Sequence, residues 1–202
     1  MSELVERVRE RVYRNVNRSE QSVAHRADHI ERVMHNAISI ASTMKDVDRE
    51  LLELAVLLHD VNQPAGRKHE HVELSLRTAE KILIEEGCTP DRTRQVLGVI
   101  AQHSTEHIET VKPTSKEARI LFDADKLDGL GAVGIARVFA LFGQMGRPPF
   151  EAILWYRQKI AISLEHVQTE EGRRLFESKR AYVEEFLQEM ESQVSSLQDY
   201  CK

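Results

Sequence analysis

Apolar residues recur along most of the chain at spacings of three and four residues, the repeat of one face of an α-helix. The first such stripe is Val5, Val8 and Val12, and the second runs from Ile30 to Ala41. The strict alternation of apolar and polar residues that is typical of half-buried β-strands does not recur. The pattern therefore predicts an all-α fold of about 8 to 10 helices.

Capping residues locate several helix boundaries. Asp48 stands directly before RELLELAVLLHD, residues 49–60, where it suits the N-cap position. Gly87 is placed to end the helix HVELSLRTAEKILIEEG, and Thr89-Pro90-Asp91 has the composition of the next helix start. TSKE, residues 114–117, has the form of a capping box before the apolar run ARILFDADKL.

The C-terminal third combines close-packing residues, a break and a long helix. The small residues of GLGAVGIAR allow close packing, whereas GRPPF, residues 146–150, breaks the chain. A final charged helix is predicted from about Thr169 to the end. Its apolar face consists of Leu175, Phe176, Tyr182, Val183, Phe186, Leu187 and Met190. We interpret this face as packing against the protein body, with a homodimer interface as the alternative.

Composition places these helices in one compact unit. The chain is 41% hydrophobic and 30% charged, with 9 glycines and 5 prolines, so a disordered or fibrous protein is not indicated. We expect a single helical domain over residues 1–202, with a core at about 20–145 and C-terminal helices at 150–200 packed on it.

Charge and cysteine content narrow the environment and the partners. A formal net charge of -5 argues against binding a nucleic-acid polymer but leaves room for a local pocket for one anionic ligand. Cys88 and Cys201 lack CxxC spacing and are interpreted as free thiols. The charged N-terminus and the lack of a long apolar run predict a cytoplasmic protein without a membrane span.

The segment LLHDVN, residues 57–62, ends an apolar run with two good metal ligands, His59 and Asp60. His25 and His29 are four residues apart, so a helix would place them on one face, with Asp28 alongside. Further histidines, His71, His103 and His107, fall at the edges of later helices. These residues alone leave two interpretations open: structural histidines or a metal site.

Asp123 and Asp125 lie inside an otherwise apolar segment. Buried carboxylates are costly unless they have a cation or hydrogen-bond donors nearby, and here the partner is either Lys126 or a metal ion. A mixed set of imidazoles and carboxylates suits Mn, Fe, Zn, Ni or Mg better than a thiolate-seeking metal.

The order of the motifs resembles one known family. DHIERVMHNAISIA, LLHDV, HVELSLRTAEKIL, IAQHS and ILFDADKLDGLGAVGIAR follow one another as in the HD-domain superfamily of metal-dependent phosphohydrolases. The resemblance spans about residues 20–195 and is greatest to small stand-alone bacterial and archaeal members with a DADRLDALGAIGIAR-type segment. Some of these relatives are nucleoside triphosphate pyrophosphohydrolases.

The resemblance implies a metal site made of His29, His59, Asp60 and Asp125. Asp125 is preferred to Asp123 because it occupies the family's A-D-x-L-D context. One divalent ion, of Mn, Mg, Ni, Co, Fe or Zn, would be held by two neutral imidazoles and two carboxylates, with positions left for water and a phosphate oxygen.

The resemblance also suggests catalytic and substrate-binding residues. Catalytic roles are expected for Asp60, His103 and Lys126, and substrate contacts for His71, Lys126 and Asp128. An alternative for Asp128 is to hold Lys126, His103 or a helix end in place. Asp123 is expected to be structural.

The expected activity is hydrolysis of a phosphorylated small molecule, most simply a nucleotide, by a metal-activated water. Many relatives have glycine or an acid after the HD pair, whereas this chain has Val61-Asn62-Gln63, which leaves a nucleotide-sensing module without turnover as an alternative. His71 and His103 could hold a second metal ion, and a dinuclear iron oxygenase of the HD type is the third interpretation.

Overall fold

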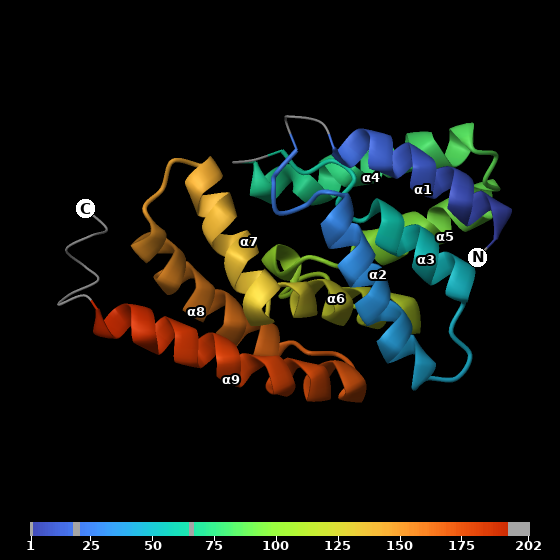
Figure 1. Cartoon of the computed structure of the whole chain (residues 1–202). Helices are drawn as coiled ribbons and strands as arrows, with labels where there is room; N and C mark the ends of the chain where they lie inside the picture. The colour runs from blue at the N-terminus through green and yellow to red at the C-terminus, as the bar shows by residue number, and fades with distance from the viewer. Residues whose placement is uncertain (1, 18–20, 65–66, 194–202) are drawn as a thin grey trace.

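The computed structural model describes residues 2–17, 21–64 and 67–193. Over these residues it contains nine α-helices, two short 3-10 helices and no β-strand, which confirms the all-α prediction (Figure 1). The elements are α1 Glu3–Val16, α2 Ala27–Ser42, α3 Arg49–Leu58, η1 Lys68–Glu70, α4 His71–Glu85, α5 Pro90–Ile100, η2 Thr105–His107, α6 Lys116–Asp128, α7 Gly131–Gln144, α8 Pro149–Glu165 and α9 Glu170–Ser192.

Helix α3 lies at the centre of the N-terminal half. It contacts α1, α2, α4, α5 and α6, and seven of its ten residues are buried. The helix starts as predicted, because the Asp48 side chain accepts a hydrogen bond from the backbone of Leu51 at 3.0 Å. It ends at Leu58, two residues before the predicted end, so His59 and Asp60 lie in the turn that leaves it. A largely buried apolar helix thus leads two polar residues into the interior.

Helices α2 and α6 pack against each other between the two ends of the molecule (Figure 1). The start of α6 corrects the predicted capping box by one residue. Ser115 is the N-cap and accepts from the backbone of Ala118 at 3.0 Å, whereas the Thr114 backbone donates to Gln102 at 2.8 Å. The Glu117 side chain instead accepts from the backbone of Asp48 at 2.9 Å, which ties the starts of α3 and α6 together.

Helices α7, α8 and α9 gather on the opposite side of α6 from α1, α4 and α5 (Figure 1). Three residues of the predicted apolar face of α9, Phe176, Val183 and Leu187, are buried, so this face packs against the protein. Tyr182 is 54% exposed, and the homodimer stays a prediction. The helix ends at Ser192, and Cys201 lies outside the described residues.

Close packing explains the small residues of GLGAVGIAR. A Cβ atom at Gly134 would collide with the backbone of Gly129, so α7 and the turn before it can approach only with glycine at this position. No single helix in the described part of the chain is long and apolar enough to cross a membrane; α6 and α7 meet the length and composition criteria only as a pair bent by 76°.

Candidate metal centre

His59 and Asp60 enter the site from the end of α3. The Nδ1 atom of His59 lies 2.8 Å from the backbone oxygen of Val56, so Nδ1 carries the proton and Nε2 presents a lone pair to the interior. Hydrogen bonding of the distal ring nitrogen to a carbonyl is the usual way a metal-ligating histidine is oriented. His59 is fully buried and Asp60 is 3% exposed, so the aspartate is an interior group.

His29 reaches the same point from the first turns of α2. Its Nδ1 lies 2.7 Å from an oxygen of Asp128, near the C-terminal end of α6. Arg32 donates to the other Asp128 oxygen at 2.7 Å, and Arg137 of α7 pairs with this carboxylate as well. Asp128 therefore stays ionised and holds the His29 ring in place. The Asp128 carboxylate contacts His29, Arg32 and Arg137. Among the described residues it makes no contact with Lys126 or His103, the side chains that the alternative interpretation expected it to hold.

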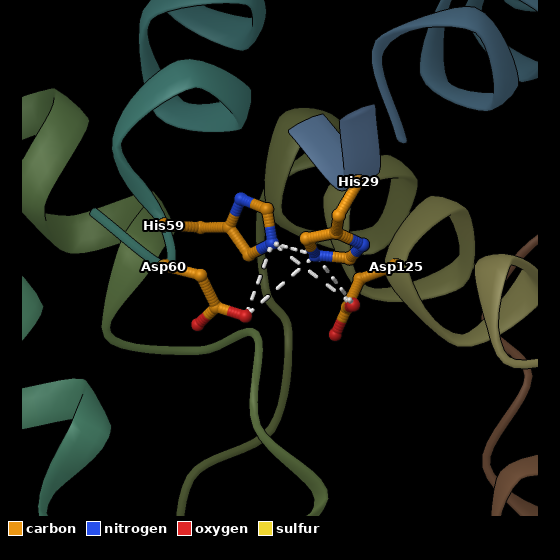
Figure 2. A group of neighbouring side chains, drawn as sticks. All are labelled: His29, His59, Asp60 and Asp125. Carbon is orange, nitrogen blue, oxygen red and sulfur yellow. Dashed lines mark hydrogen bonds and ion pairs between the residues drawn. The ribbon is translucent and has the colours of Figure 1, made fainter. Parts of the chain in front are cut away.

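Four donor atoms, from α2, α6 and the turn after α3, converge on one point (Figure 2). The Nε2 atoms of His29 and His59 are 3.2 Å apart. Asp60 Oδ2 lies 3.7 and 3.6 Å from these two nitrogens, and Asp125 Oδ1 lies 3.7 and 4.0 Å from them. Ligands about 2.1 Å from a single ion are about 3.0 to 3.4 Å apart when adjacent, so the four groups are close to the arrangement that one divalent cation requires.

The protonation states suit a cation at this point. Burial lowers the pKa of His59 to about 4, so its ring is neutral near pH 7. Burial opposes ionisation of Asp60, but the neighbouring imidazoles of His59, His103 and His29 outweigh it and keep the pKa of Asp60 well below the usual value. Burial likewise opposes ionisation of Asp125, and Lys126 and His59 outweigh it.

The pKa of His29 moves in the other direction. Burial and Arg137 disfavour its charged form, but the carboxylates Asp128 and Asp60 outweigh them and raise the pKa. The surrounding carboxylates thus favour positive charge here, whether an imidazolium or a metal ion carries it.

A second donor group shares Asp60 with the first. Ligand atoms of Asp60, His71 and His103 all lie within 4.8 Å of one another. His103 Nε2 is 3.4 Å from Asp60 Oδ1, the carboxylate oxygen opposite the one nearest His29 and His59. The Nδ1 of His103 lies 2.7 Å from the backbone oxygen of Ile100, so in the neutral ring Nε2 carries a lone pair. Such a nitrogen can bind a cation or accept a proton.

Of two other predicted residues on α6, Lys126 lies at the edge of the site and Asp123 lies away from it. Lys126 pairs with Asp125 and lies over the Phe122 ring, 5.3 Å from its centroid, at the edge of the site. Asp123 points away: it accepts from the backbones of Gln168 and Thr169, at 2.9 and 2.7 Å, just before α9. Asp125 thus belongs to the donor group, whereas Asp123 anchors the segment that precedes α9.

His25 lies before α2 rather than on it, so the predicted shared helical face is wrong, although its ring centroid is only 5.1 Å from that of His29. Asp28 is 64% exposed and pairs with Arg32 at 2.8 Å, outside the donor group. His35 and His69 are exposed, and the side chain of His107 is outside the description.

Sequence reasoning missed a pair of buried glutamines beside Asp60. With its amide nitrogen turned toward Asp60, Gln63 donates to both carboxylate oxygens, at 2.7 and 3.0 Å. Gln63 is held in turn, because its backbone donates to Gln21 at 3.0 Å and accepts from Ser22 at 3.0 Å. Gln21 donates to the backbone oxygen of Asp60 at 2.9 Å. The segment before α2 and the turn after α3 are therefore one hydrogen-bonded unit.

A pocket opens beside the donor atoms. Asp60, Asp125 and Lys126 are among the polar residues that line one part of it, and α7, α8 and α9 supply most of the apolar lining. Arg137, Trp155 and Lys159 of this lining carried no sequence prediction. Arg137 is the last residue of the GLGAVGIAR segment, but its contacts with Asp128 and Ala24 become apparent only in the folded structure.

The sequence and the fold both match known proteins. The family described as HD domain matches residues 26–130, more than half of the chain, and the protein belongs to this family. The matched segment runs from the start of α2 to just past α6 and contains all four residues of the first donor group.

Several proteins resemble the chain over nearly its full length. The uncharacterized protein YpgQ of Bacillus subtilis is 26% identical over 185 residues, covering 89% of each chain. The structure of YpgQ in complex with ADP matches with a TM-score of 0.72 and 24% identity, covering 96% of this chain and 99% of the other. A predicted HD superfamily hydrolase of an uncultured Thermotogales bacterium is 30% identical, with a TM-score of 0.59 and coverage of 95% and 91%. The chain thus has the fold of the HD-superfamily hydrolases.

Proposed function

We propose that this protein is a metal-dependent phosphohydrolase that acts on nucleotides. The observation that carries the proposal is the convergence of His29, His59, Asp60 and Asp125 on one point at the edge of a pocket. YpgQ, whose fold is similar, has been crystallised with ADP, which supports a nucleotide as the ligand class. Cationic side chains in the same pocket, Lys126 and Arg137 among them, suit a phosphate chain.

The protein's own residues would divide the work as follows. His29, His59, Asp60 and Asp125 would hold the divalent ion, and Asp128 and the Val56 carbonyl would fix the two imidazoles. When bound, such an ion lowers the pKa of a coordinated water and offsets the charge on phosphoryl oxygens. Asp60, held by Gln63, would both hold the ion and orient the water. Lys126 would attract the phosphate oxygens as negative charge develops on them.

The second donor group supports a second ion at Asp60, His71 and His103. Asp60 belongs to both donor groups, so it would help to hold both ions. This group also favours one other function, a dinuclear iron oxygenase. Oxygen uptake and an iron-dependent visible spectrum would identify that activity, and a single bound ion per chain would rule it out.

The test is release of phosphate and pyrophosphate from nucleoside mono-, di- and triphosphates and an aryl phosphate. The protein would be stripped of metal and then supplied with Mn, Mg, Co, Ni or Fe. We expect release that requires both a metal and Asp60, and the product identifies the bond that is cut. Tight nucleotide binding without release from any compound would contradict the proposal and favour a sensing module.

A further inference from the structure

The pocket beside the donor atoms has two unlike walls. The segment before α2, the turn after α3 and helix α6 contribute charged and polar groups, including His25, Asp60, Asp125 and Lys126. Helices α7, α8 and α9 contribute a mostly apolar wall with three aromatic side chains, Trp155, Tyr156 and Phe176. A ligand with a charged end and an apolar end would match these two walls.

The apolar wall is firmly fixed. Tyr156 is 2% exposed and donates from its hydroxyl to the backbone oxygen of Gly129, so it joins α8 to the turn before α7. Phe176 is 1% exposed and belongs to α9. Trp155 is half-buried, and its ring centroid lies 5.7 Å from that of Phe142 on α7. A wall fixed from three helices provides a preformed surface for a rigid aromatic ligand.

Cationic side chains line both walls of the pocket. Lys159 of α8 donates to Thr105 of η2, and Lys126 of α6 lines the same pocket. Arg137 lines the same region and binds the backbone oxygen of Ala24. The pocket that contains the donor atoms and the aromatic residues is thus also lined by three cationic residues, which suits the phosphate chain of a nucleotide.

We propose that the α7 to α9 wall is the nucleobase subsite, with the base against Trp155 and the phosphates directed toward the donor group. This inference rests on the proposed function, since it assumes that the phosphorylated ligand is a nucleotide. Every nucleobase can stack on an aromatic side chain. Such a wall would therefore favour ligands that carry a base, with little preference among the bases. The phosphate end alone would bind without using this wall.

Trp155 provides a direct probe because it is the single tryptophan of the chain. Its fluorescence, excited at the red edge of tryptophan absorption, would be followed during titration of the whole protein with ADP and with inorganic tripolyphosphate, both with Mg²⁺. Calorimetry would record the binding of each probe in parallel. We expect ADP to quench Trp155 to saturation and tripolyphosphate to bind without quenching.

A filling variant and a matched control make the test specific. Ser163 of α8 lines the apolar wall and is 5% exposed, whereas its neighbour Ile162 is 41% exposed. Ser163→Phe should weaken ADP binding at least about tenfold and leave tripolyphosphate binding unchanged. Ile162→Phe should change neither. If Ser163→Phe does not fold, Val138→Phe on the α7 side of the pocket serves the same purpose.

The outcomes separate this inference from the function on which it rests. Binding of ADP without quenching, or equal loss of both probes in Ser163→Phe, would overturn the subsite even if nucleotides are hydrolysed. Quenching by ADP in a protein that hydrolyses no nucleotide would support the subsite and contradict the hydrolase. Failure of both probes to bind would overturn both.

Discussion

The two walls of the pocket are held in place by different forces. On the donor side, three imidazoles have a hydrogen-bond partner at Nδ1: His29 has Asp128, His59 has Val56 and His103 has Ile100. On the α7 to α9 side, packing of apolar side chains determines the surface. Directional hydrogen bonds fix a group to within fractions of an ångström, whereas packed side chains tolerate exchange for others of similar volume. The donor side thus suits chemistry, and the apolar side suits selection of a ligand.

This difference predicts large effects of substitutions on the donor side and graded effects elsewhere. It also predicts that substitutions of two residues of the same type on one helix have different effects, according to whether the side chain belongs to the donor group.

The largest effect is expected for Asp125→Ala. Asp125 supplies one of the four converging donor atoms, so its loss should lower kcat at least about 1000-fold. The carboxylate is 14% exposed at the pocket, and helix content should be retained. Steady-state kinetics and circular dichroism check both statements. Activity within a few fold of the wild type would remove Asp125 from the site.

His29→Ala should lower the affinity for Mn²⁺ about 100-fold or more, because it removes one ligand and leaves Asp128 without its imidazole partner. Isothermal titration calorimetry of the metal-free protein measures the change. His35→Ala is the matched control, since His35 lies on the same helix and is exposed. Equal affinity in both variants would contradict the assignment.

Asp123→Ala should give the reverse of Asp125→Ala. Asp123 is 2% exposed and accepts hydrogen bonds from Gln168 and Thr169 at the start of α9. Its removal should lower the free energy of unfolding by about 2 kcal/mol, since buried backbone donors lose their acceptor. Urea unfolding measures the loss, and kcat per folded molecule should stay near that of the wild type. A loss of kcat equal to that of Asp125→Ala would undo the distinction between the two acids.

The smallest effect is expected for Gln63→Ala. Gln63 donates to both oxygens of Asp60, so its loss should weaken metal binding about tenfold by freeing that carboxylate. Metal titration detects the change, and Gln95→Ala, at an exposed glutamine on α5, is the control. Unchanged affinity in Gln63→Ala would show that Asp60 is held by other contacts.

Local patterns predicted the helices, and the resemblance to the HD-domain superfamily added the proposed metal ligands. The stripe ending in His59 and Asp60 predicted a buried helix that delivers ligands, and the order of the motifs added His29 and Asp125. The capping box at residues 114–117 was wrong by one position, because Thr114 binds Gln102 instead of starting the helix. Such competition between local partners is decided by tertiary contacts.

Long-range contacts account for what the sequence did not reveal. His29 and Asp128 are 99 residues apart, and Ala24 and Arg137 are 113 apart. The partner of Asp128, the role of Gln63 and the aromatic wall all depend on how separated helices come together. A single chain's pattern indicates which face of a helix is buried but not which side chain it meets.

The central claim is that His29, His59, Asp60 and Asp125 bind a divalent ion. The most direct test is an anomalous difference map from a crystal soaked in Mn²⁺. We predict a peak about 2.0 to 2.5 Å from His29 Nε2, His59 Nε2, Asp60 Oδ2 and Asp125 Oδ1, with a second peak at His71 and His103 if two ions bind. A map with manganese bound elsewhere and no peak among these four atoms would contradict the account.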